Sequence, residues 1–221
     1  MKISPTLSRS RQIAESMTGK RCVTATFAQQ KNKKMLKEVK SRKAGKKNSI
    51  IYGLIAGIVV SISMLFTVNY ISHCKGNVDF DKSLLIGYAS MLIAFSLVYV
   101  GIRNYRDKYN GGVISFGKAF KIGSMIVLIA STIYVVAWLI DYFFFIPDFA
   151  EKFSAHTLDQ LKGSGASQIE IDKQTKEMAS FVRMYKNPFF NAMMTYIEIL
   201  PVGLIVTLIS SLILKRKAAK N

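Results

Sequence analysis

The sequence predicts an all-α, polytopic membrane protein with four transmembrane helices and an extracytoplasmic helical hairpin between the third and the fourth. Two observations predict this fold class. The 221 residues are 50% hydrophobic, and long uncharged runs alternate with basic segments in a chain of formal net charge +18, which is typical of membrane proteins. Four of the apolar runs contain about 20 residues or more, enough for a helix to cross the ~30 Å hydrocarbon core of a bilayer.

Residues 1–48 precede the first apolar run and form a basic arm. They carry 14 Lys/Arg against Glu15 and Glu38, and they lack the apolar stretch of a secretory signal. We expect the arm to be disordered and to contact anionic lipids, because so polar a segment buries too little apolar surface to fold. Its Arg and Ser content is also typical of a mitochondrial presequence. Met35 opens a more compact basic segment, so residues 1–34 are expected to lie ahead of the natural start.

The first three spans are expected at about 49–71, 84–102 and 119–146. Gly53, Gly57 and Ser61 recur every four residues in the first span. We interpret them as a helix-packing seam, because small side chains let helix backbones approach closely in lipid. The third span ends in four consecutive aromatic residues, which are typical of the membrane interface. Asp141 lies about 7 Å inside this end, and we expect headgroups and water to solvate it.

Residues 147–186 are the one sizeable aqueous region and are expected to form the hairpin. Its first helix covers about 148–162, and the glycines at 163 and 165 end it. Ser167 with Glu170 is a capping-box signature that opens the second helix. The Gly-Ser turn predicts that the two helices are antiparallel. The surface formed by 148–185 is the expected contact for an envelope partner.

The fourth span, 189–214, corresponds to roughly 39 Å of helix at ~1.5 Å per residue, which crosses a bilayer with some tilt. Asn187 is expected to cap its first turn, and Pro188 to occupy the first helical position. Glu198 is the one ionisable residue inside this run. It lies roughly 15 Å from the helix start and therefore near the bilayer midplane.

Glu198 is the principal candidate functional residue. An ionised, unpaired carboxylate at this depth is costly, so we expect the side chain to be protonated, hydrogen-bonded or facing a wet cavity. The expected hydrogen-bond partners at the same depth are Tyr134 and three serines, Ser61, Ser63 and Ser96. Two interpretations remain open, because a buried acid serves either as a proton or cation site or as a polar clamp that fixes helix packing.

The second half of the fourth span carries its own features. Pro201 leaves a backbone carbonyl close to Glu198 without its helical partner, and a kink is expected there. Gly203, Thr207 and Ser211 recur every four residues and form a second small-residue seam. We expect this seam to dock on the first seam, at 53–61.

The distribution of charge predicts the orientation of the chain. If residues 1–48, the region 103–121 and the residues from 215 onward lie on one side, that side holds 23 of the 31 Lys/Arg. By the positive-inside rule both termini are therefore cytoplasmic, and the hairpin faces outward.

We find no motif for a catalytic group, a cofactor or a metal. Cys22 and Cys74 are far apart and lack metal-ligand spacing, so we expect them to be incidental. His73 beside Cys74 is a poor ligand set. No nucleotide-binding, serine–histidine or zinc-protease motif is present. Nucleic acid is not an expected partner, because no aromatic residues interleave with the basic arm.

Several motifs together resemble a known family of bacterial membrane proteins. They are Gly101–Asp107, Ile114–Gly123, Pro147–Phe149, Met178–Phe181, Lys186–Pro188 and Glu198–Gly203. The chain resembles domain of unknown function 4199 (DUF4199) over roughly residues 48–217, whereas the extension before Met35 departs from the usual family start. The resemblance implies four transmembrane helices and a bacterial cytoplasmic membrane. It implies no activity, so no catalytic residue is carried over.

Three classes of function remain. The first is a non-catalytic membrane component or accessory protein, and the second is a small transporter or channel subunit that uses Glu198 as a proton or cation site. The third is an intramembrane enzyme, which the missing motifs disfavour. No internal repeat supports a transporter. Four helices enclose little volume, so a homo-oligomer is one form that a transporter could take. We therefore expect the first class.

Overall fold

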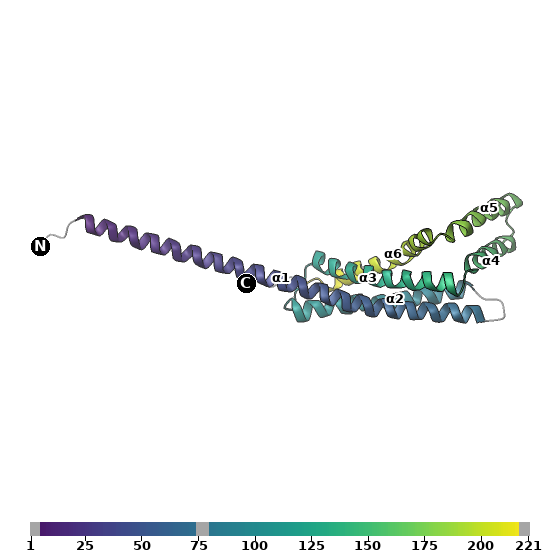
Figure 1. Ribbon diagram of the computed structural model, residues 1–221, viewed down its shortest axis with the longest axis horizontal. Helices are drawn as coiled ribbons and strands as arrows, with labels where there is room; N and C mark the ends of the chain where they lie inside the picture. Colours follow the sequence, from purple (N-terminus) through teal and green to yellow (C-terminus); the bar gives the residue numbers. More distant parts are fainter. Residues whose placement is uncertain (1–4, 74–79, 217–221) are drawn as a thin grey trace. The chain divides into compact units, whose positions relative to one another are not determined.

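The computed structural model describes residues 5–73 and 80–216, and it describes side chains for 29–33, 35–68 and 85–216. The six helices of this part of the chain are α1 (Pro5–His73), α2 (Phe80–Tyr109), α3 (Phe116–Phe144), α4 (Phe149–Gly163), α5 (Gln168–Tyr185) and α6 (Pro188–Leu214) (Figure 1). Four stretches are long and apolar enough to cross a membrane: Gln29–Val68, Leu85–Tyr109, Phe116–Phe144 and Pro188–Leu214. The predicted all-α membrane class with four such helices is confirmed.

The chain divides into two units, Met1–Ala44 and Gly45–Asn221. The first unit contains the N-terminal part of α1, where disorder was expected for residues 1–48. The structure differs from that expectation, since the described part of this arm is helical from Pro5 onward. No proline follows Pro5 in this arm, and many of its residues are Ala, Lys, Gln, Met or Arg, all of which favour helix. Side chains of the arm from residue 29 onward are mostly exposed.

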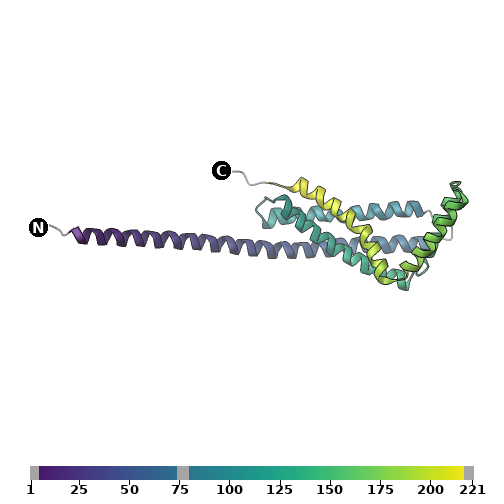
Figure 2. The ribbon, with the colours of Figure 1, turned by 90° about the horizontal axis from the view of Figure 1, so that it is seen from above.

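The second unit is a bundle in which α2, α3, α6 and the part of α1 from residue 45 run side by side (Figure 2). Its helix ends differ from the predicted spans by a few residues. α2 continues seven residues past the predicted end at 102, because the next helix-breaking residues are Gly111 and Gly112. Both adopt positive φ, 66° and 77°, a conformation that glycine adopts without steric cost.

The small-residue seams of α1 and α6 both pack against α3. A Cβ atom at Gly57 would lie 2.7 Å from Ile133 Cδ1 of α3, and one at Gly203 would overlap Val127 Cγ1 of the same helix. The predicted docking of the two seams on each other is therefore wrong. The physical reason is that the small side chains of α3, such as Ala130, let both outer helices approach the central one.

One end of the bundle joins three segments that are distant in sequence. The N–H of Ile114 donates to the carbonyl of Arg216 at 3.0 Å, and the N–H of Arg216 donates to the carbonyl of Ile114 at 2.9 Å. Asn48 Nδ2 donates to the carbonyl of Gly101 at 2.9 Å, and Asn104 Nδ2 donates to Asn48 Oδ1 at 2.7 Å. Lys46, Lys47, Arg103, Arg106 and Lys215 adjoin these contacts, so basic residues from three segments lie at this end of the bundle.

Helices α4 and α5 lie at the other end, between the end of α3 and the start of α6. They pack through the rings of Phe153 and Phe181, whose centroids are 6.4 Å apart. The predicted capping box is present, since Ser167 Oγ accepts from the N–H of Glu170 and Glu170 Oε2 accepts from the N–H of Ser167. The predicted cap of α6 is also present, with Asn187 Oδ1 accepting from the N–H of Phe189 at 2.9 Å.

Candidate functional site

Glu198 lines a cavity of about 520 Å³ in the bundle half nearest α4 and α5. All six helices contribute to the wall. The described lining residues are Val60, Met64, Thr67 and Val68 from α1, Gly87, Tyr88, Ser90 and Met91 from α2, Tyr134 and Trp138 from α3, Phe149, Ala150 and Phe153 from α4, Phe181 and Tyr185 from α5, and Met194, Thr195, Ile197 and Glu198 from α6. A cavity of this size lies within the ~300–1,000 Å³ range of small-molecule sites.

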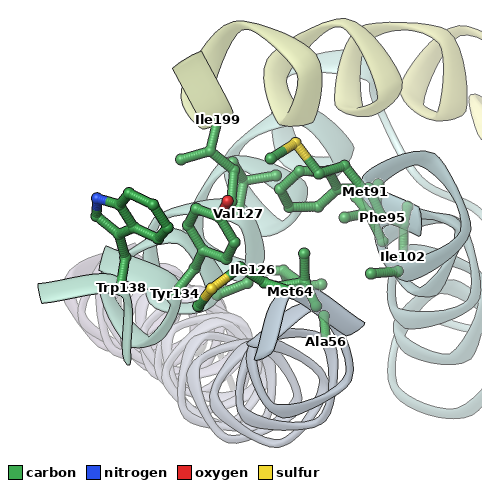
Figure 3. Packing of buried hydrophobic residues seen from close by; sticks show 14 of the residues in the cluster. Ala56, Met64, Met91, Phe95, Ile102, Ile126, Val127, Tyr134, Trp138 and Ile199 are labelled. Carbon is green, nitrogen blue, oxygen red and sulfur yellow. The ribbon is translucent and has the colours of Figure 1, made fainter. Parts of the chain in front are cut away.

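The cavity wall is apolar and aromatic. Figure 3 shows Tyr134 and Trp138 of α3 beside Ile199 of α6, with Met64 and Met91 nearby. Within the described lining, Glu198 is the only carboxyl group, and no Lys, Arg or His contributes to the wall. The cavity is partly open, because Tyr88 in its wall is 43% exposed.

The predicted hydrogen bonds of Glu198 are not found among the described residues. Tyr134 lines the same cavity, but the structure contains no hydrogen bond between the two side chains. Ser63 Oγ donates to the carbonyl of Val59 at 3.0 Å, and Ser96 Oγ donates to that of Ile93 at 2.6 Å. Ser63 and Ser96 fail as partners because each donates to a carbonyl in the preceding turn of its own helix, which is a common use of serine in apolar helices.

Ser61 Oγ is buried and has no hydrogen-bond partner in the described part of the chain. Among the residues that the structure describes, the carboxyl of Glu198 lines the cavity without a hydrogen-bond partner. Pro201 lies inside α6 and cannot donate to the carbonyl of Ile197. Since Ile197 also lines the cavity, an acceptor oxygen without its usual helical partner lies one residue from Glu198.

Asp141 is not solvated as expected. It is only 3% exposed, its Oδ2 is buried without a hydrogen-bond partner among the described residues, and it borders a separate cavity of about 370 Å³ with Leu65 and Phe145. Its side chain points into the bundle instead. Helix rotation decides this exposure, and the distance from the helix end carries no information about rotation.

Asn191 is a buried polar residue that sequence reasoning missed. It is fully buried on α6, and its Oδ1 accepts from Trp138 Nε1 of α3 at 2.9 Å. Its Nδ2 donates to the carbonyl of Tyr185 at 3.4 Å. Asn191 therefore joins α3, the end of α5 and α6 beside the cavity. An amide inside an otherwise apolar run is the sequence signal that points to such a residue.

An aromatic cluster fastens α4 and α5 to the membrane helices. The rings of Trp138 and Phe149 meet edge to face with centroids 5.1 Å apart, and those of Tyr142 and Tyr185 do so at 5.3 Å. Such pairs contribute about 0.5–1.5 kcal/mol each beyond their buried area. Burial raises the pKa of Tyr185 to about 12, so its hydroxyl is neutral at physiological pH.

An ion pair links the start of α4 to the residue after α5. Lys186 Nζ lies 2.9 Å from Glu151 Oε1. The hydrogen bond from Lys186 lowers the pKa of the Glu151 carboxyl and raises the pKa of Lys186 itself. Both side chains are about half exposed, so this pair orients the two helices more than it stabilises them.

The described residues contain no group of three His, Cys, Asp or Glu side chains that would hold a metal ion. The side chains of Cys22, His73 and Cys74 lie outside the described residues, and the interpretation that they are incidental stays a prediction.

Fold and site together define a multi-pass helical protein of membrane type, with a partly open apolar cavity whose described lining contains one carboxyl group. A family model described as "Protein of unknown function (DUF4199)" matches residues 51–216. The chain belongs to this family, which confirms the resemblance found in its motifs. No curated protein and no solved structure matches the chain.

Proposed function

We propose that this protein is a non-catalytic component of a bacterial cytoplasmic membrane, and that the α4–α5 pair forms a hairpin on the outer side that contacts an envelope partner. The proposal rests on the contacts that hold α4 and α5 against the bundle. Trp138, Asn191 and Tyr185 tie the pair to α3 and α6 through a buried hydrogen bond and ring contacts. A pair held in this way is a pre-organised surface, which reduces the ordering cost of binding a partner.

Both termini are cytoplasmic in this proposal. The hydrogen bonds around Asn48 and Arg216 support it, because they place three segments that adjoin basic residues at one end of the bundle. The positive-inside rule assigns such an end to the cytoplasm. The basic residues from 31 to 47 then lie near the anionic leaflet, where each contributes about 1 kcal/mol to lipid attraction.

A labelling experiment tests the orientation. Ser164→Cys, made after Cys22 and Cys74 are replaced by serine, puts one thiol at the bend between α4 and α5. Ala218→Cys puts one after α6. A membrane-impermeant maleimide applied to intact spheroplasts is expected to label the first thiol and to label the second only after lysis. Labelling of both thiols before lysis, or of neither, contradicts the topology.

Crosslinking tests the partner surface. Ile169 near the start of α5 is 82% exposed, whereas Ile213 near the end of α6 is 65% exposed on a membrane helix. A photoreactive residue at 169 is expected to yield one protein adduct of defined mass in intact cells, and the same residue at 213 is expected to yield none. Equal adducts at both positions, or no adduct at 169, would argue against a specific outer partner.

A further inference from the structure

We propose that the cavity around Glu198 binds a monovalent organic cation with an apolar body, and that the Glu198 carboxylate supplies the counter-charge. This inference concerns the partly open cavity beside the exposed residue Glu198 and does not depend on the partner proposed for α4 and α5. It rests on the volume, the charge and the aromatic wall of the cavity.

The volume and the wall favour a small organic molecule. The cavity of about 520 Å³ receives residues from six helices, and most of these residues are apolar or aromatic. Small-molecule sites typically have such walls, with few polar groups that fix the ligand. An inorganic cation is disfavoured, because the described residues contain no group of three His, Cys, Asp or Glu ligands.

The charge of the wall selects the sign of the ligand. Glu198 is the only carboxyl group in the described lining, and no Lys, Arg or His is present to pair with it. An anionic ligand would be repelled, and a neutral one would leave the carboxyl without a partner in an apolar site, which is unfavourable. Glu198 is an exposed residue, and a cation that enters the partly open cavity removes this cost by pairing with its carboxylate.

Aromatic rings from three helices add to the attraction. Tyr88 of α2, Tyr134 and Trp138 of α3, and Tyr185 of α5 all line the cavity. The faces of tyrosine and tryptophan rings attract cations, by ~0.5–2 kcal/mol depending on desolvation. The carbonyl of Ile197, which Pro201 leaves without its usual donor, adds an electronegative oxygen beside Glu198.

Titration calorimetry on the full-length protein in a neutral detergent tests the proposal. Tetraphenylphosphonium serves as the cationic probe, and the fluorescence of N-phenyl-1-naphthylamine reports a neutral aromatic probe. We expect the wild-type protein to bind both. Glu198→Gln is expected to weaken the cation at least tenfold while changing the affinity for the neutral probe less than twofold. Retained binding of the neutral probe shows that the variant cavity is folded.

Two further variants locate the site. Gly87 lines the cavity, and a Cβ atom there would meet nothing within 4 Å, so Gly87→Leu fills the space without a clash and is expected to weaken both probes. Asp141→Asn removes the carboxyl that borders the separate cavity of about 370 Å³, and it is expected to leave both affinities unchanged.

Four results would overturn the proposal. They are an absence of tetraphenylphosphonium binding to the wild-type protein, unchanged cation affinity in Glu198→Gln, an equal loss of both probes in that variant, and unchanged binding in Gly87→Leu. An equal loss in Glu198→Gln would show that the carboxyl supports the shape of the cavity rather than the charge of a ligand.

Discussion

Replacement of Gly203 by alanine should destabilise the bundle through α3. A Cβ atom at this position would overlap Val127 Cγ1 and would lie 3.0 Å from Phe95 Cζ, and both neighbours are fully buried. Overpacking of this kind costs ~1–3 kcal/mol. Alanine regains ~0.5–1 kcal/mol relative to glycine inside a helix. The expected net loss of unfolding free energy is therefore up to about 2.5 kcal/mol.

Gly117→Ala is the matched control for this substitution. Gly117 lies in the first turn of α3, and a Cβ atom there meets nothing within 4 Å. Alanine at 117 should therefore leave stability unchanged or raise it by up to ~0.5 kcal/mol. The assay is reversible unfolding of the purified protein in mixed micelles, followed by circular dichroism as the denaturing detergent increases.

A double-mutant cycle identifies the helix that Gly203 contacts. Val127→Ala removes both methyl groups that a Cβ atom at 203 would meet, so the double variant should lose less stability than the two single variants together, by about 0.5–3 kcal/mol. Gly203→Ala and Gly57→Ala should instead be additive, because the two glycines pack on different residues of α3. If the effects of Gly203→Ala and Val127→Ala on stability are additive, or those of Gly203→Ala and Gly57→Ala are coupled, Gly203 does not pack on Val127 as proposed.

Three further predictions concern the aqueous end and the basic arm. Asn191→Ala should lower unfolding free energy by about 1–3 kcal/mol, because it leaves the buried Trp138 Nε1 donor unpaired, and it should cost much less in a Trp138→Phe background. Because Lys186 lowers the folded-state pKa of Glu151, this pair stabilises the fold above the ordinary glutamate pKa of about 4.3 and loses that effect as pH falls through the folded value. In Glu151→Gln, the melting temperature should therefore fall less steeply than in the wild type as the pH drops below about 4.3. An equally steep fall in both proteins would contradict a stabilising role for this ion pair. Replacement of the basic residues in 31–47 by glutamine should reduce the phosphatidylglycerol that co-purifies with the protein and leave phosphatidylethanolamine unchanged, as measured by lipid mass spectrometry.

Features that depend on neighbouring residues in the sequence were predictable. The caps at Ser167 and Asn187 use side chains that bond to N–H groups two or three residues away, so the sequence contains all the atoms involved. The apolar length of each span also follows from composition alone, and α6 differs from its predicted bounds by one residue. The end of α2 was missed because a helix continues through polar residues until glycine or proline stops it.

The direction in which each helix faces was not predictable in the same way. Counting residues gives a position along a helix and nothing about the direction in which the side chain points. Rotation about the helix axis depends on which neighbours the helix meets, and this information is distributed over the whole bundle. Asp141 is therefore buried, and two of the expected partners of Glu198, Ser63 and Ser96, bond to their own helices instead.

The side-chain contacts of Glu198 explain why it is a candidate for ligand binding rather than for a structural clamp between helices. A clamp requires that the carboxyl meet a second polar group, and among the described residues Asn191 meets that requirement while Glu198 does not. Both residues lie on α6, seven positions apart and hence on the same side of the helix, yet only Asn191 is enclosed by protein atoms. The bundle thus uses the amide to hold α3 and α6 together and leaves the acid facing a cavity, where a cation is the group that would complete its contacts.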